Sequence, residues 1–221
     1  MWRGEGRKKR RDMELAAELA DGVAQLGLEL SQHAQSHLLD YLTLLQKWNR
    51  TYNLTAVRET SRMVSHHLLD SLVVVPHVKT DTLLDVGSGA GLPGIPLALA
   101  LPACRVTLLE ANHKKAAFLQ QAKAELKLDN VEVVRERVEA WQPGHRFGMV
   151  ISRAFSDLAE FAKQAGQHVM PDGLLAAMKG IYPHEELAQL PAGWRVREAI
   201  ALAIPGLLAQ RHLLLLERTS A

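Results

Sequence analysis

The stretch Leu-Leu-Asp-Val-Gly-Ser-Gly-Ala-Gly-Leu-Pro-Gly-Ile-Pro-Leu, residues 83–97, decides the fold of this chain. Apolar residues surround Asp85, and four glycines follow within the eight residues 87–94. The apolar run 95–101 then indicates a helix, with Pro96 acceptable in its first turn. The pattern predicts a strand, a tight glycine turn and a helix. A ligand can lie against such a turn, because glycine lacks a Cβ and tolerates positive φ, and the helix N-terminus adds unsatisfied N–H groups.

The glycines of this turn match two cofactor-binding patterns. Gly89-x-Gly91-x-x-Gly94 has the spacing of the dinucleotide fingerprint. Asp85-x-Gly87-x-Gly89-x-Gly91 has the spacing of the acidic loop in S-adenosylmethionine-dependent methyltransferases. The acid favours the second pattern, because it can accept from the methionine amino group, whereas a dinucleotide gains nothing from a negative charge beside its pyrophosphate. We therefore predict S-adenosylmethionine, and a nicotinamide-dependent oxidoreductase remains the alternative.

Composition bounds the class of protein. The chain has 221 residues, 48% of them hydrophobic, which suits one large domain with a small extension. Its single cysteine, Cys104, excludes a disulfide framework and is expected to be a buried bystander in a reducing compartment. No apolar run reaches the length of a membrane span. We expect a cytoplasmic monomer without a metal ion.

Charge is concentrated at the N-terminus. Residues 1–11 carry six basic side chains and one acid, a net of +5, so the remaining 210 residues carry −3 of the overall +2. We predict a disordered basic tail over 1–11, which either contacts RNA phosphates or only aids solubility. The rest of the chain is close to neutral, which argues against broad non-specific binding of nucleic acid.

Two patterns divide the rest of the chain. Helical periodicity predicts an N-terminal helical extension over 12–80, with helices at 12–27, 31–50 and 60–75 and a polar loop at 51–58. From 81 to 221 strands and helices alternate. Strands are predicted at 82–87, 105–110, 131–135, 147–152, 173–178, 194–203 and 211–217, and helices at 94–101, 113–127, 156–169 and 184–190. The fold class is α/β: a doubly wound, Rossmann-like class I methyltransferase sheet of seven strands with a terminal antiparallel hairpin.

Ligands of doubly wound sheets bind at the carboxyl ends of the strands. Glu110 follows the second strand, where a carboxylate can accept from both ribose hydroxyls of the cofactor. Val138 and Glu139 follow the third strand and are candidates for the adenine end. The alternatives are a solvated strand-end acid and a plain turn.

Arg153 follows the fourth strand, beside the methyl-donor end of the expected site. Its segment, 151–155, lacks the Asn/Asp-Pro-Pro-Tyr/Phe motif that grips an exocyclic amine, and no cysteine is present for covalent attack on a pyrimidine. Arg153 can orient a carboxylate, a phosphate or a guanine edge. A ring nitrogen such as guanine N7 has no proton to lose, so positioning alone suffices for methyl transfer. Lys179 and Arg211 lie in basic clusters that can meet RNA phosphate.

Six segments together resemble a known family. They are Trp-Asn-Arg-Thr-Tyr-Asn-Leu-Thr-Ala-Val-Arg at 48–58, His-Leu-Leu-Asp-Ser at 67–71, the glycine turn, and the stretches 151–155, 179–180 and 211–213. In order and spacing they resemble the small-subunit ribosomal RNA (guanine-N7) methyltransferases, first named glucose-inhibited division protein B, over about residues 15–217. The resemblance implies methyl transfer from S-adenosylmethionine to one guanine N7 of 16S rRNA. It also implies cofactor contacts by Gly87, Leu92, Val138, Glu139 and Arg153.

The N-terminal motif supplies candidates for the RNA side. Asn53, Thr55, Arg58 and His67 either hold guanine and RNA or satisfy one another as a buried polar network. Asp70 is expected to pair with Arg58 or His67. The expected partner is 16S rRNA or the 30S subunit, and a non-catalytic RNA-binding factor that retains the cofactor is a third hypothesis.

Overall fold

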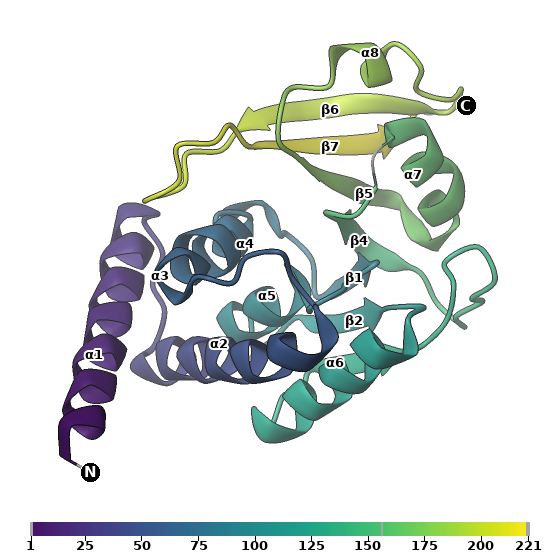
Figure 1. Ribbon diagram of the computed structural model, residues 1–221. Coiled ribbons are helices and arrows are strands. Elements are labelled where there is room, and N and C mark those ends of the chain that lie inside the picture. The colour runs from purple at the N-terminus through teal and green to yellow at the C-terminus, as the bar shows by residue number, and fades with distance from the viewer. Residues whose placement is uncertain (1, 156, 220–221) are drawn as a thin grey trace.

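A seven-stranded sheet forms the centre of the molecule (Figure 1). The computed structural model describes residues 2–155 and 157–219, without the side chains of residues 2–5, 7 and 8. The strand order is β3-β2-β1-β4-β5-β7-β6, and β7 runs antiparallel to both of its neighbours. This confirms the predicted sheet and its terminal hairpin. The strands are β1 Thr82–Val86, β2 Arg105–Leu109, β3 Val131–Val134, β4 Phe147–Ser152, β5 Val169–Lys179, β6 Trp194–Ala201 and β7 His212–Arg218.

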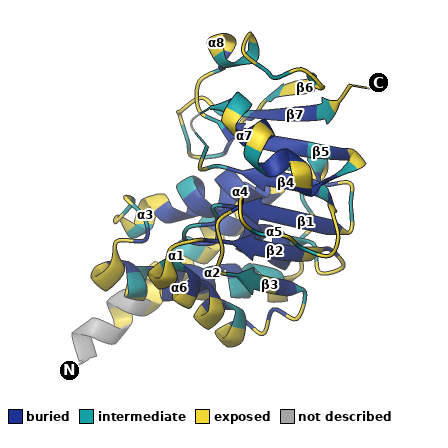
Figure 2. Ribbon diagram, turned by 90° about the vertical axis from the view of Figure 1, so that its right-hand side faces the viewer, coloured by how far each residue is buried: buried dark blue, intermediate teal, exposed yellow. Residues whose placement is uncertain are grey.

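The central strands are buried on both faces, as Figure 2 shows for β1, β2 and β4. All five residues of β1 are buried, and Leu84 pairs with Thr107 on one side and Val150 on the other. Continuous apolar runs suit this position, because helices cover both faces of a parallel sheet. The strand that carries Asp85 is therefore held between two neighbours.

Helices pack on the two faces unequally. The larger core cluster joins one face of the sheet to α1, α2, α5 and α6, and the smaller cluster joins the other face to α7. None of the described helices is long and apolar enough to cross a membrane. The helices are α1 Trp2–Gln25, α2 Gln32–Tyr52, α3 Thr60–Met63, α4 Asp70–Leu72, α5 Gly94–Ala100, α6 His113–Glu125, α7 Leu158–Ala165 and α8 His184–Leu187. Three short turns accompany them: the π-helical η1 Val64–Leu69 and the 3₁₀ turns η2 Val75–His77 and η3 Gly166–His168.

The predicted boundaries between α7 and β5 move in the structure. The helix predicted over 156–169 begins at Leu158 and is followed by η3, and Ser156 lies outside the described residues. Strand β5 then begins at Val169, four residues before the predicted start, because Val169 pairs with Phe147 across a register shift. Phe147 and Val169 are both buried, so the sheet gains two core positions there.

The predicted disordered tail over 1–11 is wrong for the residues that the structure describes. Helix α1 begins at Trp2 and runs through the basic segment, while Met1 lies outside the description. Lysine and arginine are good helix formers, which outweighs the charge run that suggested disorder. Arg10 also lies 3.5 Å from Glu14, one turn further along α1.

The predicted helix over 60–75 is divided rather than continuous. Its middle is the π-helical turn η1, where the Asp70 N–H lies against the carbonyls of Ser65 and His67. A π turn carries an extra residue and so rotates the side chains that follow it. His67 within this turn and Asp70 and Ser71 after it are all buried, so polar groups of the N-terminal extension lie in the interior.

Tyr41 ties the N-terminal helices to the glycine turn. Its buried hydroxyl, on α2, donates to the carbonyl of Ala90 at 2.6 Å. The centroids of the Tyr41 and Phe118 rings are 6.4 Å apart, and Phe118 lies on α6. Trp48 packs edge-on against the Phe118 ring, with the centroids 5.6 Å apart. Helix α2 therefore supports the turn from the side opposite to the strand.

We predict that Tyr41→Phe lowers the free energy of unfolding by about 1–3 kcal/mol, because the Ala90 carbonyl loses its donor in a buried position. Urea unfolding followed by circular dichroism measures this. Tyr52→Phe on the same helix is the matched control, since Tyr52 is 44% exposed, and we expect a change within about 0.5 kcal/mol. Equal unfolding midpoints for the two variants would contradict the anchoring role.

Candidate active site

The glycine turn is built as the sequence predicts. Gly87, Gly89 and Gly91 all have positive φ, at 70°, 60° and 86°. The N–H groups of Gly87 and Ser88 donate to the carbonyl of Leu109 at 2.9 and 3.2 Å, which ties the turn to the end of β2. A Cβ at position 87 would lie 3.0 Å from the Cβ of Ala154. Glycine is needed there both for the backbone conformation and for the close approach of the segment after β4.

Asp85 is the most constrained acid of the site. It is fully buried, and its Oδ2 accepts from the Gly94 N–H at 2.9 Å. Its Oδ1 is buried without a hydrogen-bond partner among the described residues. Burial raises the pKa of Asp85 to about 7, although the Gly94 N–H and the Arg153 guanidinium both lower it. A buried acceptor without a donor is costly, so Oδ1 fits a ligand that brings a charged N–H group.

Glu110 closes the turn from the end of β2. Its Oε2 accepts from the Gly89 N–H and its Oε1 from the Asn112 N–H, each at 2.8 Å. Only 7% of the residue is exposed. Each carboxylate oxygen has two lone pairs, so both oxygens keep acceptor capacity for a diol. Besides the ribose contact predicted for it, Glu110 therefore also shapes the glycine turn.

A cavity of about 210 Å³ opens beside these groups. Val86, Leu109 and Val138 give it apolar walls, while Gly87 and Glu110 lie at the turn. Its remaining lining residues are Ala111, Glu136, Arg137, Glu139, Ala154 and Phe155. Among the predicted cofactor residues, the cavity thus gathers Gly87, Glu110, Val138 and Glu139. Together with the Asp85 oxygen that lacks a partner among the described residues, these acceptors and apolar walls fit the adenosine and amino groups of S-adenosylmethionine.

Leu92 lies apart from that cavity. The resemblance implies that it contacts the cofactor, yet its side chain is 4% exposed and belongs to the larger core cluster. Its N–H donates to the carbonyl of Ser88 at 3.1 Å. In the described structure Leu92 therefore supports the glycine turn from behind.

Arg153 lies in an ion-pair cluster that sequence reasoning missed. Its Nη1 is 2.9 Å from Oδ2 of Asp70, and Nε of Arg211 is 2.8 Å from the other oxygen, Oδ1. The Asp70 side chain is 1% exposed, whereas those of Arg153 and Arg211 are 32% and 27% exposed. One buried carboxylate thus holds two arginines whose outer sides face solvent. The expected pairing of Asp70 with Arg58 or His67 is wrong, because Asp70 pairs with Arg153 and Arg211. These partners lie 83 and 141 residues further along the chain.

The four polar candidates of the N-terminal motif form two separate pairs. Nη2 of Arg58 donates to Oδ1 of Asn53 at 3.0 Å, and Oγ1 of Thr55 lies 3.1 Å from Nε2 of His67. The other ring nitrogen of His67 lies 3.0 Å from the carbonyl of His66. Burial, with the nearby Arg153 charge, lowers the pKa of His67 to about 4, so the ring is neutral at physiological pH. His67 is buried and Thr55 is half-buried, while Asn53 and Arg58 are exposed.

Lys179, for which a phosphate contact is predicted, has internal partners in the structure. Its Nζ lies 2.7 Å from Oε2 of Glu186 and donates to the carbonyl of Phe155 at 3.2 Å. The side chain is 9% exposed. Oε2 of Glu186 also accepts from the N–H of Leu158, so this pair fixes the segment between Arg153 and α7. The sequence holds no local signal for Glu186, because its partners come from other elements.

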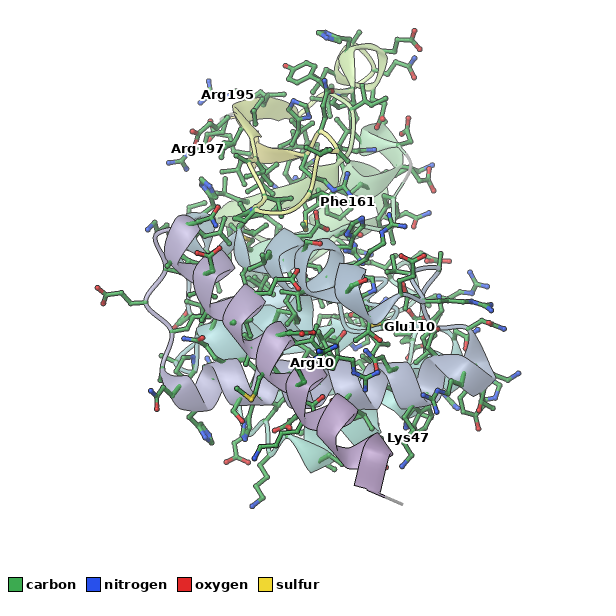
Figure 3. The ribbon with its side chains drawn as sticks, turned by 60° about the vertical axis from the view of Figure 1, so that its left-hand side comes forward. Arg10, Lys47, Glu110, Phe161, Arg195 and Arg197 are labelled. Atoms are coloured by element: carbon green, nitrogen blue, oxygen red, sulfur yellow. The ribbon has the colours of Figure 1, made fainter. Side chains whose placement is uncertain are left out.

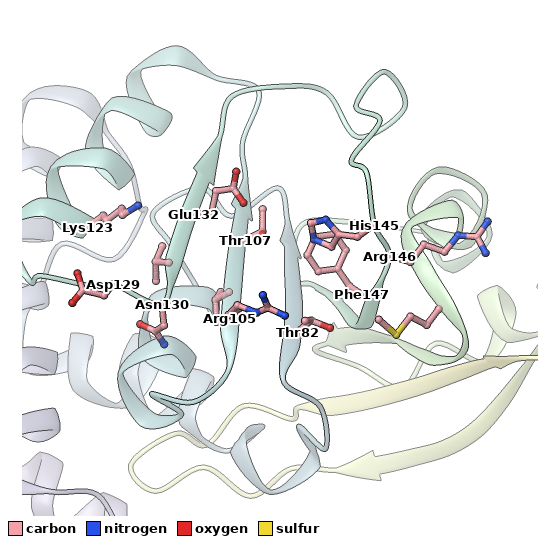
Figure 4. A pocket seen from close by; sticks show the side chains of 13 residues that line it. Thr82, Arg105, Thr107, Lys123, Asp129, Asn130, Glu132, His145, Arg146 and Phe147 are labelled. Atoms are coloured by element: carbon pink, nitrogen blue, oxygen red, sulfur yellow. The ribbon is translucent and has the colours of Figure 1, made fainter.

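A larger cavity, of about 560 Å³, lies at the other end of the strands (Figure 4). Thr82, Arg105 and Phe147, which line it, are the first residues of β1, β2 and β4. Ligands of this kind of sheet bind at the carboxyl ends of the strands. The smaller cavity at the glycine turn is therefore the site to consider. The part of the chain that the structure describes contains no cluster of His, Cys, Asp and Glu that could hold a metal ion.

The sheet order and the closing hairpin place the chain among the class I, S-adenosylmethionine-dependent methyltransferases. Two solved structures share this fold. The O-methyltransferase TomG from Streptomyces achromogenes gives a TM-score of 0.58 at 17% identity, over 91% of this chain and 96% of that one. The mitomycin 7-O-methyltransferase MmcR gives 0.60 at 16% identity, over 81% and 67%. At these identities the likeness concerns the fold alone.

Sequence comparison defines the family within this class. The family model for rRNA small subunit methyltransferase G matches residues 34–214, and the chain belongs to that family. The protein named ribosomal RNA small subunit methyltransferase G from Nitrosospira multiformis is 57% identical over 213 residues, 93% of this chain and 99% of that protein. Its namesake from Chromobacterium violaceum is 55% identical over 198 residues, 89% and 95% of the two chains. The predicted family is confirmed, which removes the nicotinamide-dependent oxidoreductase from consideration.

We predict that Asp70→Asn lowers the free energy of unfolding by about 1–3 kcal/mol, because two charge-assisted hydrogen bonds meet on a buried carboxylate. Urea unfolding of the protein without cofactor measures the change. Glu217→Gln is the matched control, because Glu217 also lies between two arginines, Arg195 at 2.6 Å and Arg197 at 3.7 Å. Those arginines lie on the outer strand β6 (Figure 3) and are 66% and 56% exposed.

For this exposed cluster we expect a loss of at most about 1 kcal/mol. Equal losses of unfolding free energy in Asp70→Asn and Glu217→Gln would show that burial does not strengthen the ion pairs of Asp70.

Proposed function

We propose that this chain transfers the methyl group of S-adenosylmethionine to N7 of a guanine in 16S ribosomal RNA. The observation that carries the proposal is the family match over residues 34–214, which spans the glycine turn, Arg153 and Arg211. Relatives above 50% identity bear the name ribosomal RNA small subunit methyltransferase G. The choice of guanine N7 rests on the resemblance described above. The chain acts as a cytoplasmic monomer on either the free RNA or the 30S subunit.

Each cofactor-binding residue contacts or supports a different part of the cofactor. Asp85 accepts from the amino group of the cofactor through its partnerless Oδ1, and Glu110 accepts from the ribose hydroxyls. Val138 and Glu139 hold the adenine end, and Arg153 lies at the methyl-donor end. Gly87, Gly89 and Gly91 let the backbone approach the ligand, and Leu92 supports them. When bound, the cofactor supplies an electrophilic methyl group on a sulfonium, which the N7 lone pair takes as the carbon–sulfur bond breaks.

The chain itself needs to position guanine rather than activate it. N7 carries a lone pair and no proton, so no general base is required. His67 matches this requirement: it is neutral, and both of its ring nitrogens already have internal partners. Arg153 keeps part of its guanidinium exposed, which suits contact with an oxygen of the base. Arg211 and Arg58, also partly exposed, serve the RNA backbone.

We expect the chain to transfer tritiated methyl groups from S-adenosylmethionine to 16S rRNA or to 30S subunits purified from cells that lack this gene. Chemical cleavage at N7-methylguanine then maps the modified base. Arg153→Gln should lose transfer while remaining folded by circular dichroism, although the loss of one partner of the buried Asp70 carboxylate lowers its unfolding midpoint. RNA binding without transfer to either substrate would favour the non-catalytic factor that retains the cofactor.

We predict that cofactor affinity rises with pH. Asp85 must be ionised to attract an ammonium group, and its pKa of about 7 keeps it largely protonated at pH 6. The dissociation constant should therefore fall about tenfold between pH 6 and pH 7.5. Isothermal titration calorimetry measures it. The titratable groups that act on Asp85 are Arg153, Glu110 and Tyr41, and the Gly94 N–H and the Ser88 side chain also lower its pKa.

The same raised pKa has the opposite effect on the protein without cofactor. Protonated Asp85 stabilises the folded state below about pH 4, and this contribution is lost as pH rises through 7. Asp85→Asn is the control for both measurements and should abolish both pH dependences. A pH dependence of affinity that survives in Asp85→Asn would assign the titration to another group.

A further inference from the structure

A third cavity, of about 300 Å³, lies at the C-terminal end of α2. We call it the α2 cleft. The last turns of α2 and the segment that follows line it with Gln46, Asn49, Arg50, Asn53, Arg58 and Thr60. Met63 closes its inner end, where the side-chain amide of Gln46 lies 3.5 Å from the Met63 sulfur. The α2 cleft shares no lining residue with the cavity at the glycine turn.

The lining carries two positive charges and no carboxylate. Among the described side chains, neither Arg50 nor Arg58 has an acidic partner within ion-pair distance, whereas Arg153, Arg195 and Arg211 each do. The other polar groups of the α2 cleft are three carboxamides and a hydroxyl, which are neutral hydrogen-bonding groups. A concave site with surplus cations and no anion of its own is complementary to an anionic ligand.

One of the two guanidinium groups is held in place before any ligand arrives. Arg58 donates to Oδ1 of Asn53 at 3.0 Å, and Asn53 is itself fixed as the cap of α2, with φ of 50° and its N–H on the carbonyl of Asn49. Preorganisation of this kind lowers the entropy cost of binding. Arginine also offers a planar pair of donors that matches two oxygens of a phosphate.

A chain of hydrogen bonds joins the α2 cleft to the methyl-donor end of the candidate active site. Oδ1 of Asn49 accepts from the N–H of Thr55 at 2.9 Å, and the Thr55 hydroxyl lies 3.1 Å from His67. Asp70, one turn beyond His67, holds Arg153. The N-terminal helices thus connect the α2 cleft to Arg153, and an RNA strand that presents its target base at Arg153 can extend along them to the cleft.

We infer that the α2 cleft binds a phosphodiester group of the RNA substrate, close to the methylated nucleotide. The inference rests on the proposed function, since it takes RNA as the ligand. Arg50 and Arg58 bind the phosphate oxygens, and the carboxamides of Asn49 and Gln46 contact the adjoining sugar. The volume admits such a group, because a water molecule takes about 30 Å³ and the cleft about ten times that. Phosphate contacts of this kind set register without reading sequence.

The test compares Arg50→Gln, Arg58→Gln and the double variant with Lys47→Gln. Lys47 lies on the same helix, is exposed and does not line the α2 cleft (Figure 3). Filter binding of a 16S rRNA transcript is measured from low to moderate salt. Loss of one phosphate contact should reduce the slope of log K against log salt by about 1. We expect this reduction for the double variant, with affinity lower by about tenfold at low salt, and an unchanged slope for Lys47→Gln.

Three further readouts separate the possible causes. The cofactor dissociation constant should be unchanged in the Arg50 and Arg58 variants. In methyl-transfer assays KM for RNA should rise while kcat at saturating RNA stays the same. Variants that match Lys47→Gln in slope and affinity would overturn the inference, as would a lower unfolding midpoint with unaltered RNA binding, which would assign these arginines to the negative end of the α2 dipole alone.

The proposed function and the inference that the α2 cleft binds phosphate can be refuted separately. A wild-type protein that binds the transcript but transfers no methyl group counts against the proposed function, while the salt slopes still decide on the α2 cleft. A wild-type protein that methylates 16S rRNA, together with arginine variants that bind like Lys47→Gln, counts against the α2 cleft alone.

Discussion

The contact between Asp85 and the first N–H group of α5 is the constraint on which the cofactor half of this structure depends. Oδ2 of Asp85 accepts from the Gly94 N–H at 2.9 Å, which brings the end of β1 against the start of α5. A Cβ at position 94 would lie 2.7 Å from that oxygen and 2.2 Å from Cδ2 of Leu108. Position 94 therefore has room only for glycine, because Asp85 and Leu108 occupy the space that a Cβ would need. The same contact leaves Oδ1 buried without a partner among the described residues, so the packing that forms the fold also leaves an acceptor for a ligand.

A second carboxylate joins the N-terminal helices to the sheet. Asp70 lies just after a π-helical turn, and its two oxygens reach Arg153 after β4 and Arg211 before β7. Tyr41 makes a comparable link from α2 to the glycine turn. Because both links use buried polar groups, they fix relative positions that apolar contact alone would leave less defined. The N-terminal helices are in this sense part of the site and more than an attachment to the methyltransferase domain.

Sequence reasoning succeeds where the determinants are local. The strand, glycine turn and helix at 83–97 follow from spacing, and so does the acid after β2, because each feature depends on near neighbours in the chain. It fails where partners are distant. The pairings of Asp70 with Arg153 and Arg211 depend on residues that only the complete topology brings together. The π-helical turn is missed for another reason, since the apolar pattern of 60–75 suits an α-helix equally well. The basic segment shows that a charge run by itself does not predict disorder when its residues favour a helix.

The distribution of charge gives the site two chemically distinct sides. Carboxylates lie around the cavity at the glycine turn, where Asp85 is fully buried and Glu110 and Glu139 line the wall. These groups suit a cofactor that carries an ammonium and a sulfonium. Arginines lie on the N-terminal helices and at the start of β7, which suits a polyanion. The two sides meet at the pair of Asp70 and Arg153. One acid there offsets one of two neighbouring guanidinium charges, so the positive side repels the cationic cofactor less. A fold that brings a cationic cofactor to an anionic substrate needs a junction of this kind, and in this chain a single buried carboxylate supplies it.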